Sequence, residues 1–141
     1  MINNAKNNVF IYGTLKRGYQ NHDDHLKLEK YLGEYRTIEC YPLVVANEWF
    51  APVLLLEKGV GYQVIGELYS VDDIKLAELD KFEHTHHTKG YKRILIVIQN
   101  IENSEHVEAY AYMNERKNLK NIGSEYMSKY TDRRYIPKNE R

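Results

Sequence analysis

The chain has 141 residues, with 20 basic and 20 acidic side chains and a formal net charge of zero. This length predicts a single domain over residues 1–141, and the balanced charge argues against a nucleic-acid partner, which would favour a basic excess. Cys40 is the only cysteine, and the first eight residues are polar, unlike a signal peptide, so we expect a cytoplasmic protein. No apolar run approaches the roughly 18 residues of a membrane span, so we expect no membrane partner.

The first half of the chain reads as short strands with one short helix. Runs rich in β-branched and aromatic residues predict strands at residues 9–12, 32–40, 53–56 and 63–70. Between the first two strands, Asn21 is a suitable N-cap for a helix over residues 22–31.

The main helix is expected in the middle of the chain. Asp72 is a good N-cap for it. Leu76, Leu79 and Glu83 stand at positions i, i+3 and i+7, so they share one face of that helix.

The second half adds two strong strands and a charged end. Strands are predicted at residues 91–98 and 105–113, part of 117–130 is expected to be helical, and we expect a loose charged tail from about residue 131. The 13 tyrosines suit half-buried positions on strands. The pattern predicts an α+β domain, a small mixed and mostly antiparallel β-barrel flanked by a few helices.

The first candidate functional segment follows the first strand, where residues 9–18 read VFIYGTLKRG. A phosphate-binding P-loop would require Lys and then Ser or Thr after Gly18, but Tyr19 and Gln20 follow. What remains is a glycine turn at a strand end, whose backbone N–H groups can cradle an anion or a developing oxyanion. The alternative is an ordinary tight turn.

The second candidate is Glu83, which shares the apolar stripe of the main helix with Leu76 and Leu79. Desolvation on such a stripe raises the pKa of a carboxyl group towards the range of a useful general base. The alternative is a solvated glutamate at a helix end, paired with Lys81 or Lys92.

Histidines raise the question of a metal site. His84, His86 and His87 lie in one polar loop, and a second cluster places His22 and His25 beside two aspartates. Neither cluster has the Cys or spaced His partner of a zinc site, so we expect solvated loops and no metal. No sequence signature pairs Cys40 with a base, so it is a poor candidate nucleophile.

The chain resembles the γ-glutamylcyclotransferase-like superfamily, in particular the branch of γ-glutamylamine cyclotransferases and AIG2-like proteins. The resemblance rests on four segments in order, which are VFIYGTLKRG at residues 9–18, VIGELY at 64–69, LDKFE at 79–83 followed by YKR at 91–93, and AYAY at 109–112.

The resemblance implies a barrel enzyme without cofactor or metal. It implies that the turn formed by Tyr12, Gly13, Thr14 and Leu15 holds the γ-glutamyl moiety, largely through its backbone, and that Glu83 is the catalytic general acid/base. The implied substrate is a small γ-glutamyl compound, whose α-amine attacks its own γ-carbonyl to release 5-oxoproline and a free amine or amino acid. We expect a monomer or a weak homodimer.

One departure from the family pattern concerns the residue after the glutamate. Family members often have Gly there, whereas this chain has His84 and reaches a glycine only at Gly90. We expect the loop from His84 to Lys89 to reshape the mouth of the pocket. Two alternatives to the enzyme remain, a non-catalytic ligand-binding or interaction protein on the same barrel and a metal hydrolase using the histidine loop.

Overall fold

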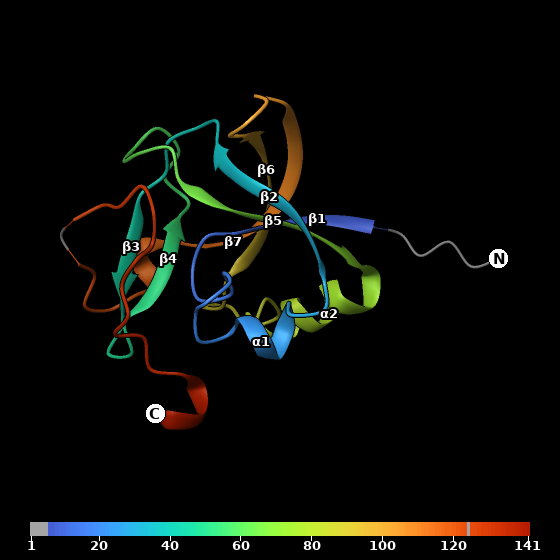
Figure 1. Ribbon diagram of the computed structural model, residues 1–141. Helices are drawn as coiled ribbons and strands as arrows, with labels where there is room; N and C mark the ends of the chain where they lie inside the picture. The colour runs from blue at the N-terminus through green and yellow to red at the C-terminus, as the bar shows by residue number, and fades with distance from the viewer. Residues whose placement is uncertain (1–5, 124) are drawn as a thin grey trace.

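The structure, a computed structural model, describes residues 6–123 and 125–141 (Figure 1). Within these residues the strands are β1 (Lys6–Ile11), β2 (Lys30–Thr37), β3 (Leu43–Ala46), β4 (Ala51–Leu55), β5 (Ile65–Asp72), β6 (Lys92–Asn100) and β7 (His106–Asn114). The helices are α1 (His22–His25), α2 (Asp73–Phe82) and the short 3-10 turns η1 (Arg116–Asn118) and η2 (Lys138–Glu140).

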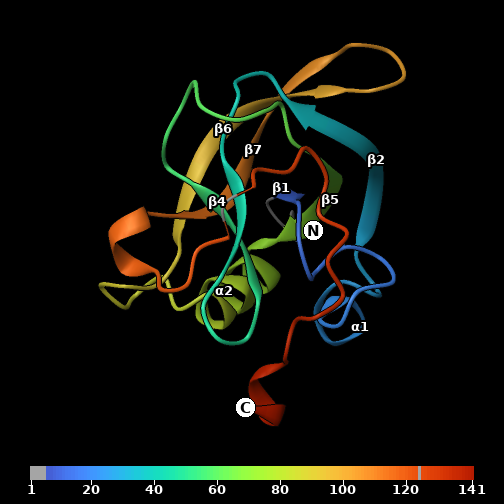
Figure 2. The same ribbon diagram turned by 90° about the vertical axis from the view of Figure 1, so that its left-hand side faces the viewer.

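Five of these strands close into a barrel in the order β1-β5-β2-β6-β7, because β1 also pairs with β7. Its neighbours are antiparallel except for β1 and β7, which run parallel with Val9 opposite Tyr110. In Figures 1 and 2, α1 and α2 lie together on one side of this barrel. The predicted fold class is therefore confirmed.

One edge of β7 is shared by two strands in succession. β1 pairs with it at Tyr110 and ends at Ile11, and β4 then pairs with it in parallel, with Leu54 opposite Met113. β3 adds to the far side of β4. The chain after β1 therefore leaves the sheet at a fork between β1 and β4.

Strand β1 is buried on both faces. Phe10 belongs to the cluster inside the barrel. Val9 and Ile11 point the other way, into a second cluster with Leu76 and Leu79 of α2. This alternation is the two-residue period of a strand, and burial on both faces explains why residues 9–12 form a continuous apolar run.

Helix α2 begins where the sequence predicts. The Asp72 side chain accepts a hydrogen bond of 2.8 Å from the backbone N–H of Lys75, as an N-cap does. The helix ends at Phe82, and Glu83 is its C-cap. Helix α1 is shorter than expected, since it ends at His25 and β2 begins at Lys30.

Residues 117–123 and 125–130, which are the described part of the stretch 117–130, do not form the helix that the sequence suggested, apart from the short turn η1. Their backbone instead pairs with the free edge of β3, where Gly123 and Met127 donate N–H bonds to the carbonyls of Val45 and Leu43. Leu119, Ile122 and Tyr126 cover the outer faces of β3 and β4. An unpaired strand edge is a strong competitor for backbone hydrogen bonds, which is why the helix does not form.

The tail that was expected to be loose from about residue 131 packs against the body of the protein. Tyr135 is buried, and the N–H of Ile136 donates to the carbonyl of Trp49 at 2.9 Å. The charged composition of the tail hid the aromatic and apolar residues that anchor it.

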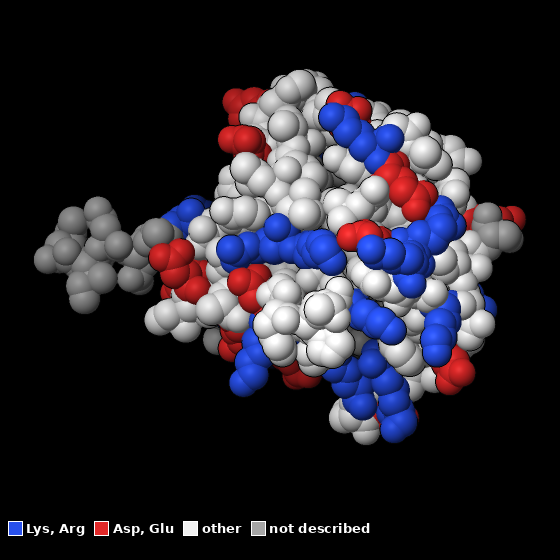
Figure 3. All heavy atoms as spheres, turned by 180° about the vertical axis from the view of Figure 1, so that it is seen from behind, with Lys and Arg blue, Asp and Glu red and all other residues white. Residues whose placement is uncertain are grey.

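Charged side chains on the far face of the molecule are mixed in sign. Figure 3 shows Lys and Arg interleaved with Asp and Glu. Pairs such as Arg93 with Asp80 at 2.9 Å and Arg116 with Glu57 at 2.8 Å bring opposite charges together. Among the described helices, none is long and apolar enough to cross a membrane.

Candidate active site

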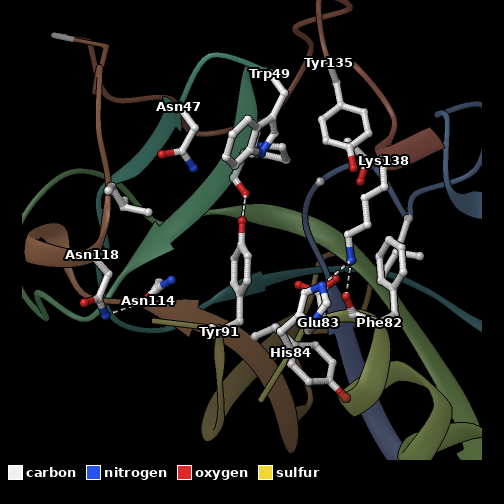
Figure 4. A pocket seen from close by; sticks show the side chains of 18 of the residues that line it. Asn47, Trp49, Phe82, Glu83, His84, Tyr91, Asn114, Asn118, Tyr135 and Lys138 are labelled. Atoms are coloured by element: carbon white, nitrogen blue, oxygen red, sulfur yellow. Dashed lines mark hydrogen bonds between the residues drawn. The ribbon is translucent and has the colours of Figure 1, made fainter. Parts of the chain in front are cut away.

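A cavity of about 670 Å³ opens beside the fork between β1 and β4 (Figure 4). Six parts of the chain meet around it: the turn after β1, the β3–β4 loop, the end of α2 with the following loop, the end of β7, residues 118–120 at η1, and the C-terminal segment. Both segments that the sequence singled out, residues 12–15 and Glu83, line this one cavity.

The turn after β1 lines the cavity, and several of its backbone N–H groups have no acceptor among the described residues. Its own shape is held by a 3.0 Å bond from the N–H of Lys16 to the Gly13 carbonyl, and by Asn21, which bonds both the backbone oxygen and the hydroxyl of Thr14. Within the described residues, the N–H groups of Gly13, Thr14 and Leu15 donate no hydrogen bond. Buried N–H groups are normally paired, so unpaired ones on a cavity wall are available to a ligand.

Gly13 is required by close packing at this fork. A Cβ on Gly13 would lie 2.6 Å from Cγ of Pro52 in β4. No side chain therefore fits between the turn and β4, and glycine allows the backbone to approach that strand.

Tyr12 joins the three strands that meet at the fork. It is buried, and its hydroxyl donates to the carbonyl of Tyr112 in β7 and accepts the N–H of Leu54 in β4 at 3.3 Å. Burial raises the pKa of Tyr12 far above its ordinary value, so the phenol stays neutral. Its hydroxyl is occupied by bonds that fix the shape of the site.

Glu83 is held in place by its backbone at the end of α2. Its N–H donates to the Leu79 carbonyl at 2.9 Å, and its carbonyl accepts the N–H of Tyr91 at 3.1 Å. The side chain is half-buried and lines the cavity. Desolvation by the surrounding protein raises the pKa of Glu83 to about 7, and the nearby positive charge of Lys138 opposes that rise. Glu83 can thus take or give a proton near neutral pH.

Two further tyrosines lie near Glu83, and the hydroxyl of each donates a hydrogen bond to another residue. Tyr91 donates to the carbonyl of Pro52 at 3.0 Å, which Figure 4 shows as a bond across the cavity. Tyr112 donates to the Asp80 carboxylate at 2.7 Å. Burial raises the pKa of both phenols, so they form a neutral wall around the carboxyl group.

Comparisons with known proteins give the chain its family. Residues 9–132 match the profile of the family described as γ-glutamyl cyclotransferase, AIG2-like. The chain belongs to this family. A γ-glutamylamine cyclotransferase of Mus musculus is 42% identical over 98 residues, which cover 67% of this chain and 64% of that protein. A Danio rerio protein, γ-glutamylamine cyclotransferase A, is 37% identical over 110 residues, covering 74% and 67%.

Solved structures agree with this assignment. The crystal structure of an AIG2-like protein from Mus musculus superposes with a TM-score of 0.83 at 32% identity, covering 96% of this chain and 99% of that one. The sequence alignment with the curated mouse relative spans just under two thirds of that relative's length.

His84 stands directly after Glu83, where the family resemblance led us to look for glycine. Its backbone is left-handed, with φ of 56°, a conformation that glycine adopts without strain. The loop then closes at Gly90, where a Cβ would collide with the His84 carbonyl. His84 and Lys89 both line the cavity. That this loop reshapes the mouth of the pocket stays a prediction.

The other histidines have separate contacts. The ring of His22 lies 2.9 Å from the carbonyl of Leu15, so it supports the turn, and the ring of His25 packs on Phe82 with centroids 4.2 Å apart. Within residues 6–123 and 125–141, no three His, Cys, Asp or Glu side chains are grouped to hold a metal ion.

The sequence did not reveal the part that the C-terminal segment plays in this site. Tyr135, Lys138 and Arg141 line the cavity. The signal was present in the run Tyr135-Ile136-Pro137, an aromatic and apolar island within a charged stretch. Such an island in a tail favours docking on the body of the protein.

Proposed function

We propose that this protein is a cyclotransferase acting on small γ-glutamyl compounds, with Glu83 as the general acid/base and the turn from Tyr12 to Leu15 holding the γ-glutamyl group. The observation that carries the proposal is the meeting of a carboxyl group of pKa about 7 and three uncommitted N–H groups in one cavity. The family and the names of its curated relatives support the same reaction.

The proposed reaction is intramolecular. The α-nitrogen of the glutamyl group attacks its own γ-carbonyl carbon, a C–N bond forms to close the ring, and the bond to the leaving nitrogen breaks. The α-ammonium loses two protons in becoming the ring N–H, and the leaving nitrogen gains two in becoming an ammonium. One carboxylate that carries these protons in turn balances the reaction, and a pKa close to the working pH suits it to both directions of transfer.

The turn has two proposed tasks. Its N–H groups would hold the γ-glutamyl chain and stabilise the oxyanion that forms when the carbonyl is attacked. Because the nucleophile is tethered to the electrophile, the site mainly has to fold the glutamyl chain into the attack geometry. A cavity of this size and aromatic lining suits that task.

The test is release of 5-oxoproline from a panel of γ-glutamyl amines and γ-glutamyl amino acids, with Glu83→Gln beside the wild type. We expect turnover by the wild type alone, because glutamine keeps the shape and removes the base. A Glu83→Gln protein with near-normal rates would refute the role of Glu83. If no panel member is turned over while some raise the melting temperature of the wild type, the barrel binds ligands without this chemistry.

A further inference from the structure

The C-terminal strap, which we define as residues 135–141, joins the two sides of the cavity. Tyr135 meets the side of the binding turn and Lys138 meets the end of α2. Figure 4 shows Lys138 reaching down from the strap towards Phe82, Glu83 and His84, with Tyr135 and Trp49 above the cavity.

Lys138 contacts both neighbours of Glu83 in the chain. Its ammonium donates to the carbonyl oxygen of Phe82, lies 3.1 Å from Nε2 of His84, and sits 4.2 Å from the centre of the Phe82 ring. An ammonium group can donate hydrogen bonds but cannot accept one. Nε2 of His84 is therefore the accepting nitrogen, and the imidazole that makes this contact is neutral. The Phe82 carbonyl is one of the last in α2, where helices leave acceptors unpaired and favour positive charge.

Tyr135 fixes the other end of the strap. The buried Tyr135 hydroxyl accepts a bond of 3.2 Å from Nδ2 of Asn21, the same nitrogen that donates to the Thr14 hydroxyl at 2.8 Å. Arg141 donates to the Tyr135 hydroxyl at 3.3 Å and stacks 4.3 Å from the Trp49 ring. A continuous set of contacts therefore runs from the binding turn through the strap to the end of α2.

We infer that Lys138 is a positioning residue for Glu83, which fixes the end of α2 and places a positive charge beside the carboxyl group. This inference rests on the proposed function, since it gives Lys138 its role through Glu83. Lys138 itself needs no contact with the reacting atoms for this task.

The effect of Lys138 on the pKa of Glu83 can be measured separately from that of the other titratable groups nearby. Glu83 lies close to three phenols, those of Tyr12 after β1, Tyr91 before β6 and Tyr112 of β7. Burial and the charge of Glu83 raise their pKa values, so all three stay neutral. Burial and the nearby charge of Lys138 lower the pKa of His84, which favours its neutral form. Lys138 is the cation that lowers the pKa of Glu83, so removing its charge moves that pKa upward.

The test compares three variants of Lys138 in steady-state kinetics across pH. Lys138→Met removes the charge and the donor, Lys138→Gln keeps a donor for the Phe82 carbonyl, and Lys138→Arg keeps the charge. Lys81→Met is the matched control, since Lys81 is an exposed lysine on the same last turn of α2 and outside the cavity lining. Glu83→Gln is measured in the same series.

We expect Lys138→Met to lower kcat by about 10-fold, with a smaller change in KM, because a displaced base loses attack geometry. In both neutral variants the acid limb of kcat/KM shifts to higher pH, and the shift shrinks at high salt because Lys138 is largely exposed. Lys138→Arg restores the limb, and Lys81→Met matches the wild type.

Neutral variants with the wild-type kcat and acid limb would overturn the role of Lys138 while leaving that of Glu83 intact. If Glu83→Gln retains turnover, the proposed function itself fails, and this outcome is separate. If Lys138→Met does not fold, the position of the acid limb of kcat/KM in Lys138→Gln alone tests the role of Lys138.

Discussion

Replacing Glu83 by glutamine should abolish the proposed turnover and stabilise the fold, with a stability gain that depends on pH. Desolvation raises the pKa of Glu83 from 4.5 to about 7, so the folded state disfavours the carboxylate. A raised folded pKa gives stability that is complete below the unfolded value and is lost as pH rises through the folded one. At roughly 1.36 kcal/mol per pH unit, the wild type loses about 3 kcal/mol between pH 4.5 and 7 relative to the glutamine variant.

The assay is urea or thermal unfolding of both proteins at pH 4.5 and pH 8. At pH 8 we expect the melting temperature of Glu83→Gln to lie roughly 9 °C above that of the wild type, at about 3 °C per kcal/mol for a domain of this size. At pH 4.5 the two should nearly agree, because Glu83 is then protonated and neutral in the folded protein, as glutamine is, and every other titrating group is shared. A difference in stability that is the same at both pH values would refute the desolvation of Glu83.

Two further predictions concern the fork. Gly13→Val should weaken substrate binding roughly 10-fold, since overpacking of about 1–3 kcal/mol against Pro52 displaces the turn; unchanged KM and ligand affinity would count against the turn as a binding site. Tyr12→Phe should lower the free energy of unfolding by about 1–3 kcal/mol, because it removes the donor to the Tyr112 carbonyl and the acceptor of the Leu54 N–H. Urea unfolding measures this loss, with the exposed Tyr62→Phe as control, and equal losses in both variants would contradict the argument.

Local patterns in the sequence were enough to predict the parts of this fold that depend on neighbours in the chain. The Asp72 cap and the leucines of α2 predict one helix and its buried face, and they place Glu83 at the end of that helix. The apolar run of β1 predicts a strand, and Gly13 after it predicts a turn. These features follow from backbone hydrogen bonding and from side-chain periods of 3.6 and 2.

The sequence could not predict contacts that join distant segments. Lys138 and His84 stand 54 positions apart, and Asn21 and Tyr135 stand 114 apart. Neither side-chain periodicity nor helix capping predicts a contact between such distant residues. The charged tail was therefore predicted to be loose. The helix predicted within 117–130 was wrong for the same reason. This stretch pairs with the free edge of β3, and that edge exists only once the sheet has assembled. The meeting of the turn and Glu83 was likewise expected from the family resemblance and not from spacing.

The position of the cavity follows from where backbone groups lose their partners. β1 leaves the edge of β7 at Ile11 because β4 takes that edge over, so the N–H groups of Gly13, Thr14 and Leu15 have no strand to bond. α2 ends at Phe82, where its last carbonyls lose their donors as at every helix end.

Unpaired backbone groups that face a cavity need partners from outside their own element. At the end of α2 the partner is the Lys138 ammonium. At the end of β1 the described chain supplies none, and the proposed partner is the γ-glutamyl group of the substrate. On this reasoning a γ-glutamyl ligand should slow hydrogen exchange at the amides of Gly13, Thr14 and Leu15. We expect Glu83→Gln to bind the ligand without turning it over, so the same protection should persist in that variant. Its absence there would separate the turn from the ligand.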